Sequence, residues 1–229
     1  MTRVLAGVMM VGLLATGGCD GAKQAPVAAK TPAPAPAPKG PEVRIVAFGD
    51  SLFAGYGLRA EQAYPVRLQA ALRARGLNAT AINAGVSGDT TEDGRARLGF
   101  TLGQAGGQGR APDLVLISLG GNDMLRGLPP EQTRANLDAM LSELERRHIK
   151  VVVMGMLAAP NMGPDYAQQF NAIFPALAKQ HHAVLMPFFL KPIYQRPDLQ
   201  LPDHIHPTAQ GVEAMVSATV ETAAGALKP

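Results

Sequence analysis

Short apolar runs, separated by longer stretches that are apolar on one face only, predict alternating strands and helices beyond residue 42. Residues 44–48, 114–119 and 151–154 are nearly continuous runs of apolar or β-branched side chains, and residues 78–82 and 183–186 are weaker runs of the same kind. Such runs are typical of parallel strands that are covered on both faces. We therefore predict a strand at each of these places.

Between the runs, two stretches carry apolar residues at helical spacing. One stripe consists of Leu137, Met140, Leu141 and Leu144, and the other of Tyr64, Leu68, Ala71 and Leu72. Pro65 suits the first turn of the second helix, and Gly76 suits its end. The alternation of strand and helix, repeated about five times, predicts an α/β fold with a doubly wound parallel sheet and right-handed crossovers. In that architecture a functional site forms outside the carboxyl ends of the strands.

The first 42 residues have a different pattern. Arg3 precedes an apolar stretch at residues 4–14 and small residues at 15–18, so we predict a signal peptide over residues 1–19. A buried N-terminal helix is the alternative, but the glycines and prolines that follow would leave it nothing to pack against. Residues 20–42 hold six of the chain's 19 prolines and predict an extended linker, with a Pro-rich recognition motif as the alternative. The domain is then residues 43–229.

Composition and charge narrow the class of protein. Hydrophobic residues make up 47% of the 229 residues and charged residues 17%, which is too apolar for a disordered chain. No internal apolar run is long enough to span a bilayer. After residue 42, 17 basic residues nearly balance 16 acidic ones, and this argues against nucleic acid as the main partner. The single cysteine, Cys19, excludes an internal disulfide and a four-cysteine metal site.

Four polar clusters stand where loops would follow the predicted strands. They are Gly-Asp-Ser-Leu at 49–52, Ser-Gly-Asp-Thr at 87–90, Gly-Gly-Asn-Asp at 120–123 and Asp-His-Ile-His-Pro at 203–207. Taken alone, none of these clusters indicates a function, because a serine in such a turn is usually a helix cap and a lone histidine is usually structural. Together they contain what acyl hydrolysis needs: a hydroxyl nucleophile, a base, an acid that holds the base, and fixed donors for a developing oxyanion.

In their order and spacing these clusters resemble the GDSL, or SGNH, hydrolase family, and the resemblance extends from residue 44 to the last helix. Within the family the chain looks most like the bacterial arylesterase, thioesterase I and lysophospholipase branch, because of the segments at 54–56, 83–90 and 159–166. The G-x-S-x-G motif of ordinary α/β-hydrolases is absent, since Phe53 stands where its second glycine would be. The resemblance implies a flavodoxin-like three-layer α/β/α sandwich with a five-stranded parallel sheet.

The resemblance also implies a role for each residue of the site. Ser51 would be the nucleophile, and Asp203 and His206 would complete the triad. The backbone N–H of Ser51, together with Gly88 and Asn122, would form the oxyanion hole. No metal and no cofactor are implied.

His204 offers two alternatives to this assignment. It could exchange roles with His206, although Pro207 and the spacing favour His206. Alternatively, Asp203, His204 and His206 could bind zinc, but that site would need further ligands and would leave the serine, glycine and asparagine clusters unexplained. The remaining histidines are interpreted as structural residues: His148, His181 and His182.

Substrate contacts are predicted from position along the chain. The loop after Asn122 would supply an apolar acyl pocket through Met124, Leu125 and Leu128. Further candidates for the pocket are Phe188, Phe189, Leu190 and Leu201. The resemblance implies a serine esterase that hydrolyses short to medium acyl esters or thioesters. A carbohydrate O-acetylesterase and a non-catalytic envelope binding protein are the alternatives.

The end of the signal peptide resembles a bacterial lipoprotein cleavage site, in which a cysteine after small residues is acylated. Cys19 has the required position, although Thr16 stands where that pattern usually has Leu. The resemblance implies an exported protein of the periplasm or cell envelope, held at a membrane through an N-terminal lipid anchor only. Secretion with an unmodified Cys19 is the alternative.

Overall fold

The structure is a computed structural model that describes residues 38–105 and 110–228. The predicted signal peptide, the predicted acylation site at Cys19 and most of the predicted linker lie outside the described residues. Within the described ranges, no helix has both the length and the apolar character needed to cross a membrane.

The described residues form a parallel sheet of five strands in the order β2-β1-β3-β4-β5. The strands are β1 (Val43–Gly49), β2 (Ala79–Gly85), β3 (Leu114–Ser118), β4 (Lys150–Met154) and β5 (Val184–Met186). The five predicted strands are confirmed, and only the end of β2 differs from its prediction by more than one residue.

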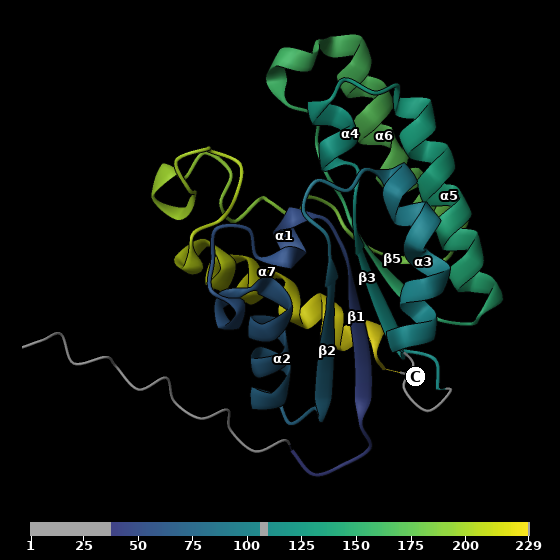
Figure 1. The fold of residues 1–229 in the computed structure, drawn as a ribbon, viewed down its shortest axis with the longest axis vertical. Helices are drawn as coiled ribbons and strands as arrows, with labels where there is room; N and C mark the ends of the chain where they lie inside the picture. The colour runs from purple at the N-terminus through teal and green to yellow at the C-terminus, as the bar shows by residue number, and fades with distance from the viewer. Residues whose placement is uncertain (1–37, 106–109, 229) are drawn as a thin grey trace, which may run out of the picture. The chain divides into compact units, whose positions relative to one another are not determined.

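Strand order reverses at β1, which lies between β2 and β3 (Figure 1). Sheets of this kind place their ligands outside the carboxyl ends of the strands at such a reversal. Gly49 at the end of β1 pairs with Gly85 of β2 and with Ser118 of β3, so the three strands end at the same level. The loops that carry the first three polar clusters therefore start from one edge of the sheet.

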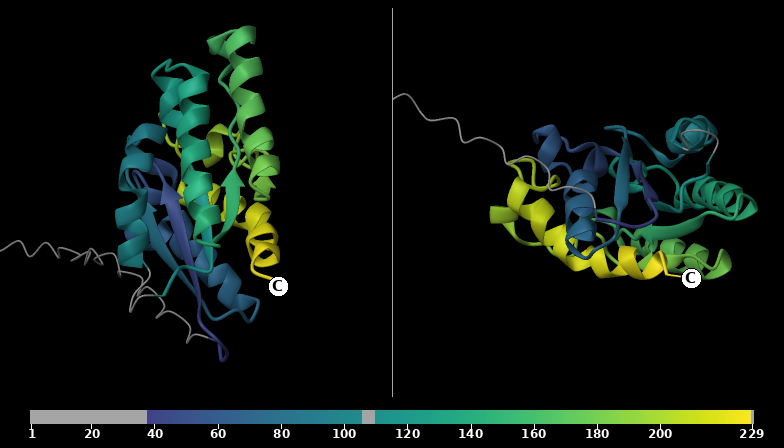
Figure 2. Two further views of the ribbon diagram at one scale, coloured as in Figure 1. Left: turned by 90° about the vertical axis from the view of Figure 1, so that its right-hand side faces the viewer. Right: turned by 90° about the horizontal axis from the view of Figure 1, so that it is seen from below.

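Helices cover both faces of the sheet and complete the three layers. On one face α2 (Tyr64–Ala74) packs against α7 (Ala209–Ala226), and Figure 2 shows this pair on the opposite side of the sheet from α3 and α5. On the other face α5 (Pro130–Arg146) contacts both α3 (Thr91–Ala105) and α6 (Pro164–Gln180). The short elements are α1 (Ser51–Ala54), α4 (Gly121–Leu125), η1 (Ala60–Gln62), η2 (Pro160–Met162) and η3 (Pro197–Leu199).

Both predicted helical stripes face the core. Pro65 lies in the first turn of α2, and Gly76 follows its end with a φ of +83°. Leu68 and Leu72 of this helix are fully buried, and the predicted stripe of α5 is buried as well. The two helices therefore form where apolar spacing and end signals predict them.

Candidate active site

Ser51 begins α1 directly after β1. Asp50 caps this helix, since its carboxylate accepts the N–H of Leu52 at 3.0 Å. The helix lies so close to the end of β2 that a Cβ at Gly85 would come 2.3 Å from the Ala54 nitrogen, so only glycine fits there. The Ser51 hydroxyl is thereby held at the edge where strand order reverses.

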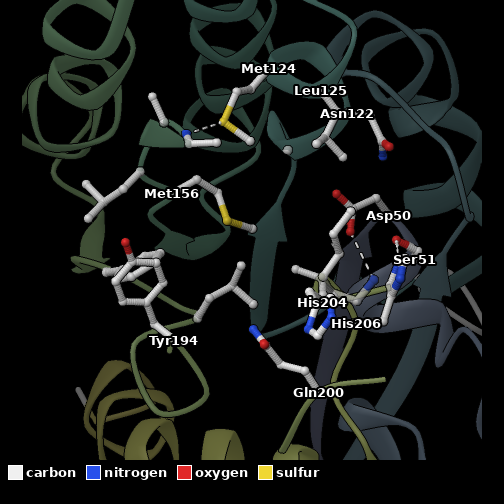
Figure 3. Close-up of a pocket in the computed structure, with 18 of the residues that line it drawn as sticks. Asp50, Ser51, Asn122, Met124, Leu125, Met156, Tyr194, Gln200, His204 and His206 are labelled. Atoms are coloured by element: carbon white, nitrogen blue, oxygen red, sulfur yellow. Dashed lines mark hydrogen bonds between the residues drawn. The ribbon is translucent and has the colours of Figure 1, made fainter. Parts of the chain in front are cut away.

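Ser51, His206 and Asp203 form one hydrogen-bonded row. Ser51 Oγ lies 2.8 Å from His206 Nε2 (Figure 3), and His206 Nδ1 lies 2.7 Å from Asp203 Oδ2. A carboxylate can only accept hydrogen bonds, so the N–H at Nδ1 donates a hydrogen bond to Asp203. Nε2 is then left to accept a hydrogen bond from the serine hydroxyl. The imidazole is therefore placed to take the proton of Ser51.

Asp203 holds the turn that carries His206. Its Oδ1 accepts the backbone N–H groups of Ile205 and His206 at 2.9 and 3.0 Å. Burial opposes ionisation of this carboxyl, but these bonds and the bond from the imidazole outweigh burial and hold the pKa of Asp203 at about 2. The carboxylate is therefore ionised at neutral pH and can stabilise a protonated His206.

Gly88 and Asn122 line the same cavity as Ser51. Gly88 has a φ of +89°, a conformation that favours glycine. The Asn122 amide donates one hydrogen bond to the Asp89 carbonyl at 2.9 Å, which orients the side chain and leaves its second N–H for a ligand. Figure 3 shows this amide directed toward the side of the cavity where Ser51 lies.

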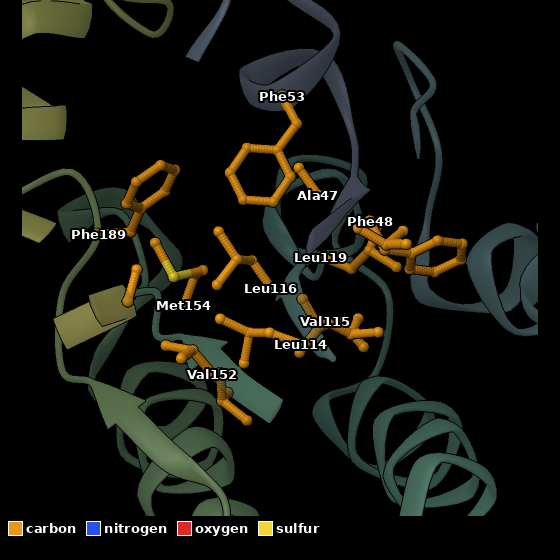
Figure 4. Close-up of a cluster of buried hydrophobic side chains, with 14 of the residues drawn as sticks. Ala47, Phe48, Phe53, Leu114, Val115, Leu116, Leu119, Val152, Met154 and Phe189 are labelled. Carbon is orange, nitrogen blue, oxygen red and sulfur yellow. The ribbon is translucent and has the colours of Figure 1, made fainter. Parts of the chain in front are cut away.

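The buried side of α1 is anchored among aromatic rings. Phe53 stacks on Tyr64 with 5.2 Å between ring centroids, and Phe189 meets the two rings edge-on at 5.6 and 5.0 Å. Figure 4 shows Phe53 and Phe189 around the apolar side chains of β3 and β4. Phe189 is fully buried in this core, so its predicted place in the acyl pocket is wrong.

A cavity of about 650 Å³ opens beside Ser51. It is lined by Met124 and Leu125 of α4, whose contact with substrate stays a prediction, and by Met156 and Leu157 from the loop after β4. In Figure 3 Met124 and Met156 lie on the far side of this cavity from His206. Phe188 and Leu190 also line the cavity, as predicted.

Leu128 and Leu201 were predicted to contribute to the acyl pocket, but they are not among the residues that line this cavity. The helix that carries Met124 ends at Leu125, and Gly127 follows with a φ of +64°, so the chain turns before it reaches Leu128. The carbonyl of Leu128 instead accepts the hydroxyl of Tyr166 at 3.0 Å. Position along an irregular loop therefore does not determine which residues reach a pocket.

Two parts of the site were not predicted. Tyr56, half exposed, lies over the His206 ring with 4.4 Å between ring centroids. The loop after β4, residues 156–160, contributes a wall of the cavity. The rule that sites form at the carboxyl ends of strands could have found this loop, whereas nothing in the sequence pattern indicates the Tyr56 contact.

Asp50 is a further titratable group beside Ser51. Burial raises the pKa of its carboxyl to about 7, and the charges of Asp89 and Asp123 add to this effect, although the N–H of Leu52 opposes it. The cavity therefore contains a group whose charge changes near neutral pH.

His204 lines the cavity but does not replace His206. In the described part of the chain, the imidazole that contacts Ser51 is that of His206, and both of its nitrogens are engaged. His204 has a φ of +57° and an exposed side chain. Among residues 38–105 and 110–228, no three His, Cys, Asp or Glu side chains are grouped so that they could hold a metal ion.

Sequence comparisons match this chain to lipid and ester hydrolases. A model of the GDSL-like Lipase/Acylhydrolase family matches residues 47–214. An arylesterase of Vibrio mimicus is 42% identical over 164 residues, which are 72% of this chain and 80% of that protein. Thioesterase 1/protease 1/lysophospholipase L1 of Escherichia coli (strain K12) is 37% identical over 163 residues, which are 71% of this chain and 74% of that protein.

Solved structures share the fold over most of the chain. AlinE4, a SGNH-hydrolase family esterase, is 51% identical, with a TM-score of 0.69 and coverage of 83% of this chain and 100% of that one. TesA is 33% identical, with a TM-score of 0.73 and coverage of 81% of this chain and 99% of that one.

Proposed function

Since the chain belongs to the GDSL-like lipase/acylhydrolase family and is a carboxylic ester hydrolase, we propose that it acts through Ser51, His206 and Asp203. The observation that supports this assignment is the row of hydrogen bonds from the serine through the imidazole to the carboxylate, at 2.8 and 2.7 Å. This row provides a nucleophile, a base and a group that holds the base.

In the proposed reaction, Ser51 Oγ attacks the acyl carbonyl carbon while His206 Nε2 takes its proton. The ionised Asp203 stabilises the imidazolium that forms. The carbonyl oxygen becomes an oxyanion and accepts hydrogen bonds from the N–H groups of Ser51 and Gly88 and from the Asn122 amide. His206 then protonates the leaving group, and water repeats the sequence on the acyl-enzyme.

We propose acyl esters or thioesters of short to medium chain length as substrates. The cavity wall is apolar, and each methylene buried there would contribute about 0.8 kcal/mol to binding. The similar proteins are an arylesterase and a thioesterase/lysophospholipase, which supports the same substrate classes here. The mostly apolar lining of the cavity of about 650 Å³ suits an acyl chain better than the hydroxyl groups of an acetylated carbohydrate.

The test is a panel of aryl esters, acyl-CoA thioesters, lysophospholipids and acetylated sugars, given to the wild type and to Ser51→Ala. We expect hydrolysis of the first three classes and a loss of about 10³-fold or more in the variant. Wild-type turnover in Ser51→Ala would refute the nucleophile. A strict preference for acetylated sugars would select the O-acetylesterase instead.

We also propose export and acylation at Cys19, on the evidence of the sequence at residues 1–19. Metabolic labelling with a radioactive fatty acid should mark the wild type and spare Cys19→Ser. Labelling of neither chain would favour secretion with an unmodified cysteine.

A further inference from the structure

Asp123, the residue after Asn122 in α4, is a buried carboxylate that the proposed reaction does not use. It is 1% exposed. Its Oδ2 accepts the N–H of Thr91 at 2.9 Å, and its Oδ1 accepts the hydroxyls of Thr91 and Thr133, the latter at 3.2 Å. Neutral donors alone therefore hold this charge in place within the described part of the chain.

The bonds of Asp123 join the two segments that carry oxyanion donors. Thr91 is the first residue of α3 and stands three residues after Gly88. Asp123 is the direct neighbour of Asn122. The carboxylate therefore connects the helix that carries the Asn122 amide to the segment that carries the Gly88 N–H.

Two other hydrogen bonds cross the same gap, but they are less protected from water. The Asn122 amide donates to the Asp89 carbonyl at 2.9 Å, and the exposed Arg126 donates to the Gly88 carbonyl at 2.7 Å. Bonds made by exposed charged side chains contribute little, because water competes for them. The Asp123 carboxylate is the fully buried link between the two segments.

The negative charge of Asp123 opposes the reaction, so we look for its role in the hydrogen bonds that it accepts. A nearby carboxylate repels a developing oxyanion. The field of Asp123 reaches the cavity, since it contributes to the raised pKa of Asp50. A group that acted through its charge alone would therefore slow turnover.

We infer that Asp123 is a positioning residue that sets the distance between the Gly88 N–H and the Asn122 amide by holding Thr91. Donors stabilise an oxyanion only when each lies roughly 2.7–3.1 Å from its oxygen. This inference rests on the proposed function, because it assumes that both donors meet one oxyanion.

The test is a double-mutant cycle of Asp123→Ala and Asn122→Ala, with rates normalised by active-site titration of Ser51. Asn122→Ala should lower kcat by about 10²- to 10³-fold. Asp123→Ala should lower kcat by about 10- to 100-fold with KM changed less than about threefold, because positioning matters most in the transition state. In the Asn122→Ala background the same substitution should lower kcat by less than about threefold. Equal losses in both backgrounds would overturn the inference.

Two further variants separate positioning from stability. Asp123→Asn should recover most of kcat, since its amide oxygen can still accept from the N–H of Thr91 and the two hydroxyls can rotate to accept from its nitrogen. Thr133→Val is the matched control: it removes one hydrogen bond from the same carboxylate on the α5 side and should lower thermal stability while kcat stays within about twofold. If Asp123→Ala does not fold, Thr91→Val takes its place in the cycle, with a smaller non-additive loss of kcat expected and an additive loss contradicting the inference.

Failure of the inference and failure of the proposed function give different results. A large loss in Asn122→Ala combined with additive behaviour of Asp123→Ala keeps the oxyanion hole and removes only the role of Asp123. Wild-type kcat in Asn122→Ala would remove the proposed oxyanion hole itself.

Discussion

Two histidines in this chain have both ring nitrogens hydrogen-bonded, yet their partners give them different chemistry. His206 has a carboxylate at one nitrogen and the hydroxyl of Ser51 at the other. His181, which follows α6, has Glu145 3.0 Å from Nδ1 and Asp138 2.6 Å from Nε2. The two rings therefore differ in what faces Nε2, which is a hydroxyl at His206 and a carboxylate at His181.

The reason lies in which partners can donate. A carboxylate only accepts, so His181 keeps both contacts only while both nitrogens carry protons. Burial alone would lower the pKa of His181, but the hydrogen bonds to Asp138 and Glu145 outweigh burial and raise it. While it is protonated, the ring links the end of α6 to α5 through both carboxylates. At His206, the hydroxyl can donate, so Nε2 keeps a lone pair for the proton of Ser51.

Substitution of each histidine by glutamine tests the difference between them most directly. His206→Gln keeps a hydrogen-bonding side chain but removes the base, so kcat should fall by about 10³-fold or more. His181→Gln should leave kcat within about twofold, because the ring lies outside the cavity. The measurement is kcat on a saturating soluble aryl ester. Similar losses in the two variants would show that the difference in partners does not determine their roles.

The pH dependence of thermal stability is a second test of the difference between the two histidines. Because the pKa of His181 is raised above 6.5, the stability that its charge contributes is fully present below pH 6.5 and is lost as pH rises through the folded-state pKa. His181→Gln should therefore lower the thermal midpoint by a few degrees at about pH 5.5, which corresponds to about 1–3 kcal/mol, and by less at about pH 9. His182→Gln, at the exposed neighbouring position, is the control and should change little at either pH. A pH-independent deficit in His181→Gln would contradict the protonated link.

The smallest expected effect concerns the ring that covers His206. Tyr56→Phe keeps the contact at 4.4 Å and should retain full kcat/KM, whereas Tyr56→Ala should lose about threefold to tenfold, since an aromatic contact contributes about 0.5–1.5 kcal/mol. The measurement is kcat/KM on one short aryl ester for both variants. A loss in Tyr56→Phe as large as that in Tyr56→Ala would assign the effect to the hydroxyl instead of the ring.

The predictable part of the fold is the part whose signal is local. Strands β1, β3 and β4 contain nearly continuous apolar runs, so their place follows from sequence alone. Helix α3 could not be predicted in this way, because its interior holds Gly94, Gly99 and Gly103. Gly94 is required by a distant contact, since a Cβ there would come 2.3 Å from Cδ1 of Leu119. A requirement of that kind is visible only once the layers are assembled.

The residues of the site also fall into those with a local signal in the sequence and those without one. Ser51, Asn122 and His206 stand in motifs of the sequence, and the strand-end rule brings them to one edge. The roles inferred for Asp123 and His181 depend on partners tens of residues away, Thr91 for the first and Asp138 and Glu145 for the second. No sequence pattern indicates that such distant positions are in contact, so the roles of these two residues could be inferred only from the structure.

The direction of β1 has a practical consequence. The strand starts at Val43 on one edge of the sheet and ends beside Ser51 on the other, so the described chain begins at the edge away from the cavity (Figure 1). A bead or sensor chip coupled to the protein near Val43 should therefore leave the entrance facing the bulk solution. Immobilised esterase prepared in that orientation should turn over dissolved reagents as fast as the free enzyme.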